Sequence, residues 1–167
     1  MYGARISVHA LMIMKIKIIQ LGKNKDRWLS EAISEYTKRL RPMCNLQIQQ
    51  LADISIKQMG DKELVIQKES QNILDKLEAD DYVILLDEAG EEKNSLEFSK
   101  FLTSLYDRKR IVFVIGGVYG TSDELKRRAQ LRLSLSRLTF THRMVRLILI
   151  EQIYRAMMIS NGRPYHV

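Results

Sequence analysis

The apolar and polar residues of the chain follow two patterns that alternate along its length. Short apolar segments predict five strands, at residues 15–21, 46–51, 82–86, 110–115 and 131–136. The third and fourth segments contain almost no polar residue, which is typical of parallel strands that helices cover on both faces. We expect the third strand to end at Asp87.

Between the predicted strands, apolar residues recur at helical spacing. This spacing predicts helices at residues 28–40, 62–77 and 95–105, from about residue 121, and at residues 143–159. In the first two helices we expect Trp28, and Leu64 together with Val65, to belong to the apolar faces. Ser95 is the expected N-cap of the third helix, and Thr121 and Glu124 are expected to form a capping box in the fourth.

Strands that alternate with helices predict an α/β fold with a mostly parallel sheet and helices on both of its faces. Of the 17 residues in the last predicted helix, 12 are apolar, so we expect this helix to be covered on more than one side. A length of 167 residues without a Pro-, Gly- or Ser-rich linker predicts a single domain at residues 14–167. Residues 1–13 are expected to be a peripheral N-terminal extension.

Composition excludes several classes of protein. Residues 1–13 lack the apolar region and the cleavage site of a signal peptide, and no segment reaches the roughly 18 apolar residues of a membrane-spanning helix. Cys44 is the only cysteine and the three histidines are far apart, so we expect neither an internal disulfide nor a zinc site. These features predict a cytoplasmic protein without a bound metal.

The charged residues are unevenly distributed. Residues 1–100 contain 15 basic and 16 acidic residues, whereas residues 101–167 contain 12 basic and 4 acidic residues, so the net charge of +7 arises in the C-terminal part. Such an excess indicates a surface for the phosphates of a nucleic acid or for anionic lipid. A basic face that only keeps the protein soluble would give the same numbers.

Three polar or glycine-rich segments follow the third, fourth and fifth predicted strands, at residues 85–90, 115–120 and 135–142. Because ligands of parallel α/β sheets bind outside the carboxyl ends of the strands, we expect these segments to meet at one site. The spacing of Gly116, Gly117 and Gly120 fits neither a dinucleotide-binding motif nor a P-loop. By itself it indicates a tight turn between a strand and a helix.

In combination, these segments are much more specific than any one of them. In order along the chain stand the motifs Leu-Asp-Glu-x-Gly (86–90), Phe-Val-Ile-Gly-Gly-x-x-Gly (113–120), Leu-Ser-x-Ser-x-x-Thr-Phe-x-His (133–142), Glu-Gln-x-Tyr-Arg-Ala (151–156) and Pro-Tyr-His (164–166). From Met14 to its C-terminus, the chain closely resembles the RlmH (YbeA) family of ribosomal RNA methyltransferases, which belong to the SPOUT class.

The resemblance implies a C-terminal trefoil knot, a homodimer, and S-adenosyl-L-methionine as the methyl donor. It also implies methylation at N3 of a pseudouridine in the 23S ribosomal RNA of the large ribosomal subunit. By matching position, it assigns cofactor contacts to Leu86, Gly116, Gly117, Ser136, Arg137, Leu138, Thr139, Phe140 and Thr141. Thr141 departs from the family pattern, which usually has proline there.

The expected reaction requires the imide N3 to lose its proton, so the site needs a base. His166 and His142 are the candidate bases, because imidazole titrates near neutral pH. The resemblance places Tyr165 together with His166 against the target nucleoside. Five arginines are expected to bind RNA phosphates or to order the C-terminus: Arg137, Arg143, Arg146, Arg155 and Arg163.

Two other functions fit the same sequence. The first is a non-catalytic RNA-binding or ribosome-associated factor that has kept the fold and lost the donor site. The second is a SPOUT methyltransferase that acts on transfer RNA. Binding of S-adenosyl-L-methionine separates the first of these from an enzyme, and the identity of the methylated RNA separates the second.

Overall fold

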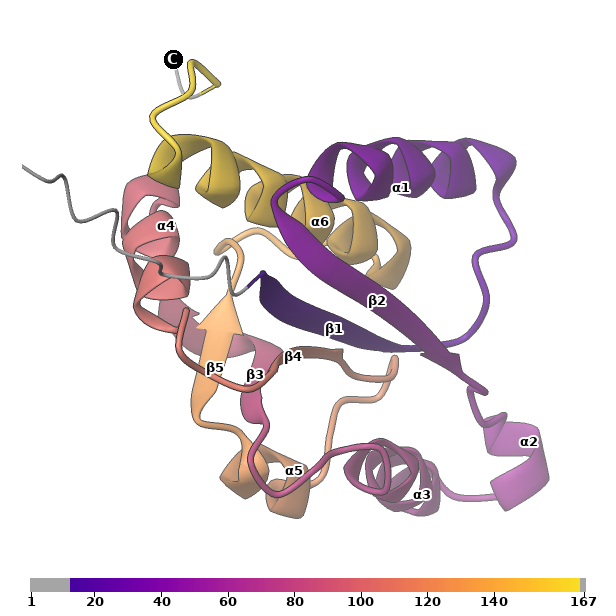
Figure 1. Ribbon diagram of the computed structural model, residues 1–167. Helices are drawn as coiled ribbons and strands as arrows, with labels where there is room; N and C mark the ends of the chain where they lie inside the picture. Colours follow the sequence, from indigo (N-terminus) through magenta and orange to yellow (C-terminus); the bar gives the residue numbers. More distant parts are fainter. Residues whose placement is uncertain (1–12, 166–167) are drawn as a thin grey trace, which may run out of the picture.

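The computed structural model describes residues 13–165, in which five parallel strands form one sheet of order β2-β1-β4-β3-β5 (Figure 1). The strands are β1 (Met14–Leu21), β2 (Cys44–Leu51), β3 (Tyr82–Glu92), β4 (Ile111–Ile115) and β5 (Leu131–Ser134). The helices are α1 (Arg27–Leu40), α2 (Ile56–Met59), α3 (Lys62–Leu74), α4 (Ser95–Ser104), α5 (Asp123–Arg128) and α6 (His142–Ser160). The predicted α/β fold with a parallel sheet is confirmed.

Helices cover both faces of the sheet, as predicted. Helices α1, α4 and α6 lie on one face, and α3 and α5 lie on the other (Figure 1). Successive side chains of a strand point to opposite faces. In β4, Phe113 therefore belongs to the core beneath the first group of helices, and Val112 and Val114 belong to the core beneath the second. All three are fully buried, so β4 lies at the centre of the molecule.

Strand β3 is longer than the sequence predicts. It continues to Glu92 instead of ending at Asp87, because β5 pairs with it on both sides of a bulge. Because residues 87–92 are mostly polar, a search for apolar segments does not predict this extension. Gly90 permits the close approach of the two strands, since a Cβ at this position would lie 2.7 Å from the Arg132 carbonyl oxygen.

Two residues predicted to belong to the apolar faces, Trp28 in α1 and Leu64 in α3, do not face the core. Trp28 is 53% exposed and Leu64 is 49% exposed, whereas the residues that follow them, Leu29 and Val65, are fully buried. Neighbouring residues of a helix point about 100° apart, so only one of each pair can face the sheet. Leu29 shares its face with Ile33, four residues later, and Trp28 does not.

Two N-caps differ from the prediction by one residue. Asn94, not Ser95, caps α4: its side-chain oxygen accepts a hydrogen bond from the Glu97 N–H, and the Glu97 carboxylate accepts one from the Asn94 N–H, both at 2.9 Å. Ser122, not Thr121, caps α5. At both helices two adjacent residues can act as caps, so the local sequence does not decide between them.

Other boundaries differ as well, and one short helix was not predicted. Helix α3 ends at Leu74 instead of residue 77, and β5 ends at Ser134 instead of residue 136. Helix α2 is a single turn that the apolar pattern does not indicate, because it buries no side chain. It begins where the side chain of Ser55 accepts a hydrogen bond from the Lys57 N–H.

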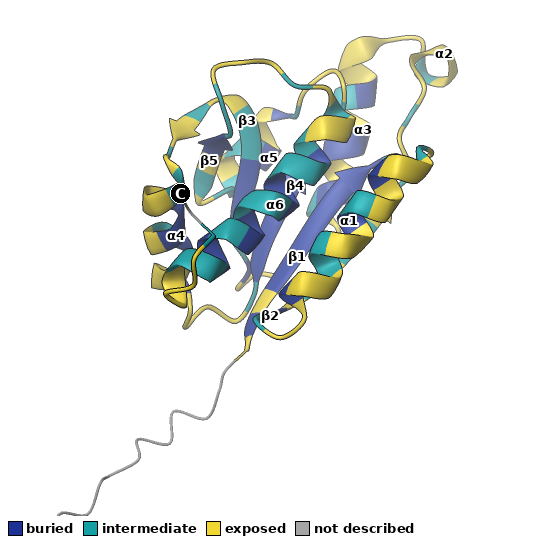
Figure 2. Cartoon of the chain, turned by 90° about the horizontal axis from the view of Figure 1, so that it is seen from above, coloured by how far each residue is buried: buried dark blue, intermediate teal, exposed yellow. Residues whose placement is uncertain are grey.

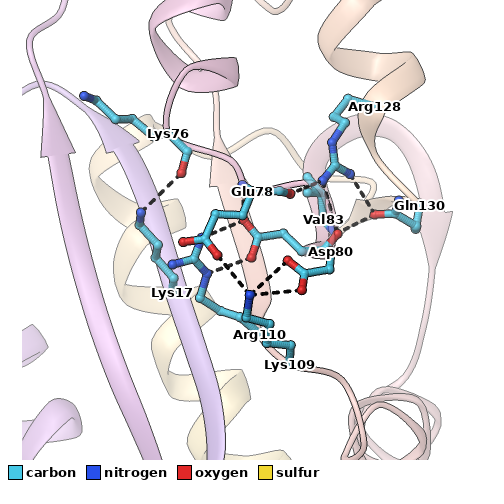
Figure 3. A network of polar contacts seen from close by, with 10 residues as sticks. Lys17, Lys76, Glu78, Asp80, Val83, Lys109, Arg110, Arg128 and Gln130 are labelled. Carbon is cyan, nitrogen blue, oxygen red and sulfur yellow. Dashed lines mark hydrogen bonds and ion pairs between the residues drawn. The ribbon is translucent and has the colours of Figure 1, made fainter.

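The N-terminal ends of the central strands are joined by a polar network (Figure 3). Asp81, just before β3, has a side chain that is 1% exposed, and the Arg110 guanidinium donates to both of its carboxylate oxygens at 2.7 Å. At the end of α5, Arg128 donates to the Glu78 carbonyl at 2.7 Å. Burial alone would raise the pKa of Asp81, but the hydrogen bonds from Arg110 hold this pKa below its ordinary value.

Several predictions concern features that the structure does not test. Of the predicted N-terminal extension, residues 1–12 lie outside the described residues, and Ile13 is exposed. The trefoil knot, which the parallel fold would accommodate, stays a prediction. Within residues 13–165, no helix has the length and apolar character needed to cross a membrane.

Candidate active site

A cleft of 870 Å³ opens at the C-terminal ends of β3, β4 and β5. Residues 86–89, 115–124 and 132–136 form most of its lining, so the structure brings together the three segments that the sequence singled out. Helix α3 contributes Ile66 and Gln67 to one wall, and the first turn of α6 contributes His142. The volume lies within the range of about 300–1,000 Å³ that is common for small-molecule sites.

Of the nine residues predicted to contact a cofactor, six line the cleft: Leu86, Gly116, Gly117, Ser136, Leu138 and Phe140. The other three lie on the loop between β5 and α6 but outside the lining. Arg137 points to solvent, with its Nε 3.1 Å from the carboxylate of Glu92. Thr139 is exposed, and Thr141 is the N-cap of α6.

Hydroxyl groups order the loop between β5 and α6. The Ser134 Oγ donates to the Ser136 carbonyl at 3.0 Å, and the Ser136 Oγ accepts from the Leu138 N–H at 2.9 Å. At the end of the loop, the Thr141 Oγ1 accepts from the Met144 N–H at 3.4 Å. These bonds fix the backbone at the cleft, while the side chain of Leu138 remains 73% exposed and available to a ligand.

The glycine loop after β4 rests on α3, which the sequence analysis did not include in the site. Glu69 is 4% exposed, and its Oε1 accepts from the Ile54 N–H at 2.8 Å. A Cβ on Gly117 would lie 2.1 Å from the Glu69 Oε2, so a larger residue there requires the buried Glu69 carboxylate or the loop to move. The next residue of α3, Ser70, accepts at its Oγ from the Ser122 N–H at 2.8 Å, beyond the other end of the loop.

The burial of Glu69 could have been predicted from the sequence, although a search for apolar residues alone does not find it. Val65, Glu69 and Ile73 are spaced by four residues, so they share the buried face of α3. An acidic residue between two core positions is uncommon unless it has a specific role. Burial raises the pKa of Glu69, and the nearby charge of Asp53 raises it further, although the hydrogen bond from Ile54 lowers it.

Of the two predicted catalytic residues that lie within residues 13–165, His142 lines the cleft and Tyr165 does not. Burial lowers the pKa of its imidazole, and the positive charge of Arg146 lowers it further. The carboxylate of Glu88 and the backbone of Gly116 act in the opposite direction, but they are the weaker influences. The His142 side chain is therefore neutral at neutral pH and can accept a proton.

Tyr165 lies towards the other end of α6. Its hydroxyl donates to the Glu151 carboxylate at 3.3 Å, and its ring centroid is 4.8 Å from the Arg155 guanidinium. Glu151 follows His142 by nine residues, which corresponds to about 13 Å along the helix axis. Within one chain, the structure thus separates Tyr165 from the cleft. His166 lies outside the described residues.

The three arginines of α6 that were expected to bind RNA have different surroundings. The side chain of Arg143 is 61% exposed and lies 3.0 Å from the Asp26 carboxylate. Arg155 is half-buried, and its NH2 lies 2.7 Å from the Glu151 carboxylate. Arg146 is 7% exposed, which assigns it an ordering role in the interior. Of the three, only Arg143 has a mostly exposed side chain.

The lining combines apolar walls, backbone groups and an excess of acidic side chains. Leu86, Leu138 and Phe140 supply apolar surface, and the glycine loop exposes its backbone. The acidic residues of the lining are Glu63, Asp87, Glu88, Asp123 and Glu124, and the basic ones are Lys126, Arg127 and Arg132. Such a lining suits a ligand that has an apolar ring and a positive charge. Residues 13–165 contain no group of three or more side chains that could hold a metal ion.

Comparison with known proteins adds independent information. A family model described as "Predicted SPOUT methyltransferase" matches residues 14–166. The chain is 42% identical over 159 residues to the ribosomal RNA large subunit methyltransferase H of Desulfitobacterium hafniense, covering 92% of this chain and 99% of the relative. It is 44% identical over 161 residues to the protein of the same name from Clostridioides difficile, with the same coverage.

Among solved structures, Lpg2936 from Legionella pneumophila, in complex with the bound cofactor SAM, aligns with a TM-score of 0.41 and 11% sequence identity. The alignment covers 88% of this chain and 66% of that chain. At this distance the likeness says nothing about individual residues of the cleft.

Proposed function

The chain belongs to the SPOUT methyltransferase family, within the group of ribosomal RNA large subunit methyltransferase H, and from this premise we propose that it methylates ribosomal RNA of the large subunit. S-adenosyl-L-methionine is the proposed methyl donor. One observation carries the proposal: the three loops that bear the family motifs converge on the 870 Å³ cleft. The reaction takes place in the cytoplasm, where the substrate is found.

The residues of the cleft fit the proposed donor. Its adenine ring requires apolar walls and backbone hydrogen-bonding groups, which Leu86, Leu138, Phe140 and the glycine loop offer. The donor carries a positive sulfonium, and the excess of acidic residues in the lining favours a cationic group. A Cβ on Gly117 would meet Glu69, so this position keeps the loop backbone close to α3.

When bound, the donor supplies a methyl group that its sulfonium has already activated. The chain's own residues then have two tasks: to hold the acceptor in line with this methyl group and to remove one proton. The proposed acceptor is N3 of a pseudouridine in 23S ribosomal RNA, and an imide nitrogen attacks only after it loses its proton. We propose that His142 accepts this proton, because its lowered pKa keeps the imidazole neutral.

The enzyme is proposed to work as a homodimer in which Tyr165 and His166 of one copy complete the cleft of the other. Two observations support this arrangement. Tyr165 is bonded to Glu151, which lies about 13 Å along α6 from His142, and Tyr165 does not line the cleft of its own chain. Apolar residues of α6 remain partly exposed and offer a surface to a second copy, namely Met144, Leu147, Ile148, Met158 and Ile159.

Two measurements test the proposed function. Isothermal titration calorimetry with S-adenosyl-L-methionine should give saturable binding, and absence of binding would favour a non-catalytic RNA-binding factor. Mass spectrometry of ribosomal RNA from cells that lack the protein should reveal one unmethylated pseudouridine in 23S RNA. A lost methyl group in transfer RNA instead would assign the enzyme to a different substrate.

A further inference from the structure

The segment between β1 and α1 gathers exposed cations. Lys23 and Lys25 are exposed, and the side chain of Arg27 is 92% exposed. Among residues 13–165 no acidic side chain forms an ion pair with either lysine, and Arg27 pairs only with Glu31, itself 64% exposed. Ion pairs this exposed are weak in water, so the segment presents a net positive charge to solvent.

This segment lies beside the cleft without lining it. Asp26, within the segment, holds Arg143 at 3.0 Å, and the residue before Arg143 is His142, which lines the cleft. The first turns of α1 and α6 consequently lie next to each other at the edge where the strands end (Figures 1 and 2). A molecule that reaches into the cleft past α6 would meet the exposed lysines.

A buried arginine fixes the position of the segment. Arg146 is 7% exposed, and its guanidinium donates to the Leu21 carbonyl and to the Asn24 side-chain oxygen. Leu21 ends β1 and Asn24 lies between the two lysines, so this contact from α6 sets the path of the backbone. Cations on a preorganised backbone lose less conformational entropy when they bind a partner.

The only tryptophan of the chain stands next to these cations. Trp28 lies in the first turn of α1 and is 53% exposed, while Leu29 takes the core position beside it. An exposed indole among cations is a common feature of surfaces that bind single-stranded RNA, where unpaired bases stack on aromatic rings and phosphates pair with basic side chains.

We infer that Lys23, Lys25, Trp28 and Arg143 form a contact surface for ribosomal RNA beside the cleft. The lysines and Arg143 bind phosphates, and the Trp28 indole stacks on an unpaired base near the nucleotide to be methylated. This inference rests on the proposed function. It moves part of the RNA surface into the N-terminal half of the chain, where the overall charge gives no sign of it.

Co-sedimentation with purified large ribosomal subunits, from cells that lack the protein, tests this surface. Two variants remove it: Lys23→Glu combined with Lys25→Glu, and Trp28→Ala. We expect each to bind the subunits at least about tenfold more weakly, with unchanged affinity for S-adenosyl-L-methionine in calorimetry. The dependence of the lysine variant's binding on salt should also become weaker, by about one unit of slope per lost phosphate contact.

Two controls separate the RNA contact from general effects. Lys57→Glu combined with Lys68→Glu changes the net charge equally at exposed lysines of α2 and α3, and it should bind within about twofold of the wild type. Trp28→Phe keeps an aromatic ring and should retain most of the affinity.

Three outcomes would contradict the inference or its premise. If the lysine variant and Trp28→Ala bind the subunits like the wild type, the surface does not contact RNA. If Trp28→Ala changes only the oligomeric state in sedimentation velocity, Trp28 belongs to a protein interface instead. If the wild type itself binds neither S-adenosyl-L-methionine nor the subunits, the proposed function fails, which is a different result.

Discussion

Gly117 and His142 both line the cleft, and the state of each depends on a buried neighbour. Gly117 packs against the Glu69 carboxylate of α3, which is in turn held by the Ile54 N–H. His142 is neutral because it is buried beside the Arg146 charge. At the scale of single residues, the cleft is therefore set by contacts behind its surface as much as by the residues that line it.

Replacement of Gly117 by Ala should disturb both stability and donor binding. The added Cβ would lie 2.1 Å from the Glu69 Oε2, so either the Glu69 carboxylate must leave its hydrogen bond with the Ile54 N–H or the loop must shift. We expect a loss of about 1–3 kcal/mol in the free energy of unfolding and about tenfold weaker binding of S-adenosyl-L-methionine, or about 1.4 kcal/mol. Gly162→Ala is the control for donor binding: nothing lies within 4 Å of a Cβ there, so this variant has only the backbone strain of a φ of +64° and should bind the donor like the wild type. Donor binding by G117A equal to that of the wild type would contradict the packing argument.

Replacement of His142 by Gln should lower kcat by a factor of about 10² to 10⁴, the usual contribution of a general base. Because burial and Arg146 lower the pKa of the His142 imidazole, the wild type should keep its full rate at pH 7. Its rate should fall only below about pH 6.5 as the imidazole becomes protonated. The variant should lose this acidic limb of the profile while its donor affinity in calorimetry is retained. An identical pH profile for both proteins would exclude His142 as the base.

At the scale of elements, the two ends of the sheet differ in structure. At the C-terminal ends of the strands, loops open the cleft, and the buried polar residues there hold loop backbone. At the N-terminal ends, Asp81 and Arg110 join β3 to β4 directly. The Asp81–Arg110 pair and the buried residues of β4 lie outside the loops at the C-terminal ends, and loops on a rigid scaffold commonly carry chemistry.

Replacement of Asp81 by Asn should cost about 3–5 kcal/mol of unfolding free energy, since it leaves Arg110 without its buried partner. The folded-state pKa of Asp81 lies below its unfolded value. The pair therefore stabilises the protein above about pH 4, the ordinary pKa of an aspartate, and this contribution is lost as pH falls through the folded pKa. Chemical denaturation of both proteins from pH 7 to pH 2.5 measures the difference, which should shrink with acid. Glu78→Gln, at a carboxylate that is 53% exposed, should change stability by less than about 1 kcal/mol.

At the scale of the whole molecule, the length of α6 separates two residues that the sequence predicts to act at one site, His142 and Tyr165. His142 begins this helix at the cleft, and the residues that contact Tyr165 lie about 13 to 20 Å further along it. The chain cannot bring its own tail to its own cleft without releasing Tyr165 from Glu151 and Arg155. In the proposed dimer, the tail of one copy reaches the cleft of the other copy, so Tyr165 can keep its contacts with Glu151 and Arg155 of its own chain.

Deletion of residues 165–167 should abolish methylation while donor binding remains intact. If the tail acts on the other copy, mixing this variant with H142Q should restore activity, because the hybrid dimer contains one intact cleft and one intact tail directed at it. Methyl transfer by each variant alone and by the refolded mixture provides the measurement. Full turnover by the truncated protein would contradict the role of the tail, and no recovery on mixing would contradict its exchange.

The order of the elements could be read from the sequence because the apolar segments are strongly periodic and each pattern arises from neighbouring residues. The loop residues of the cleft could be read because they follow the strands whose ends meet in a parallel sheet. Trp28 and the caps of α4 and α5 were wrong by one position, since two adjacent residues were equally suitable locally. In α3, Leu64 was expected on the apolar face together with Val65, but only Val65 is buried. The extension of β3 was missed because its pairing with β5 is a long-range contact.

By itself, therefore, the sequence determined the class of fold, the order of its elements and the segments that meet at the cleft. Tertiary structure alone decided that Glu69 supports Gly117, that Arg146 is buried against Leu21, and that Tyr165 lies far from His142. The physical reason is the range of the interactions. Periodicity and turn chemistry act within a few residues, whereas packing, burial and the pKa of a side chain depend on neighbours that the fold brings from elsewhere in the chain.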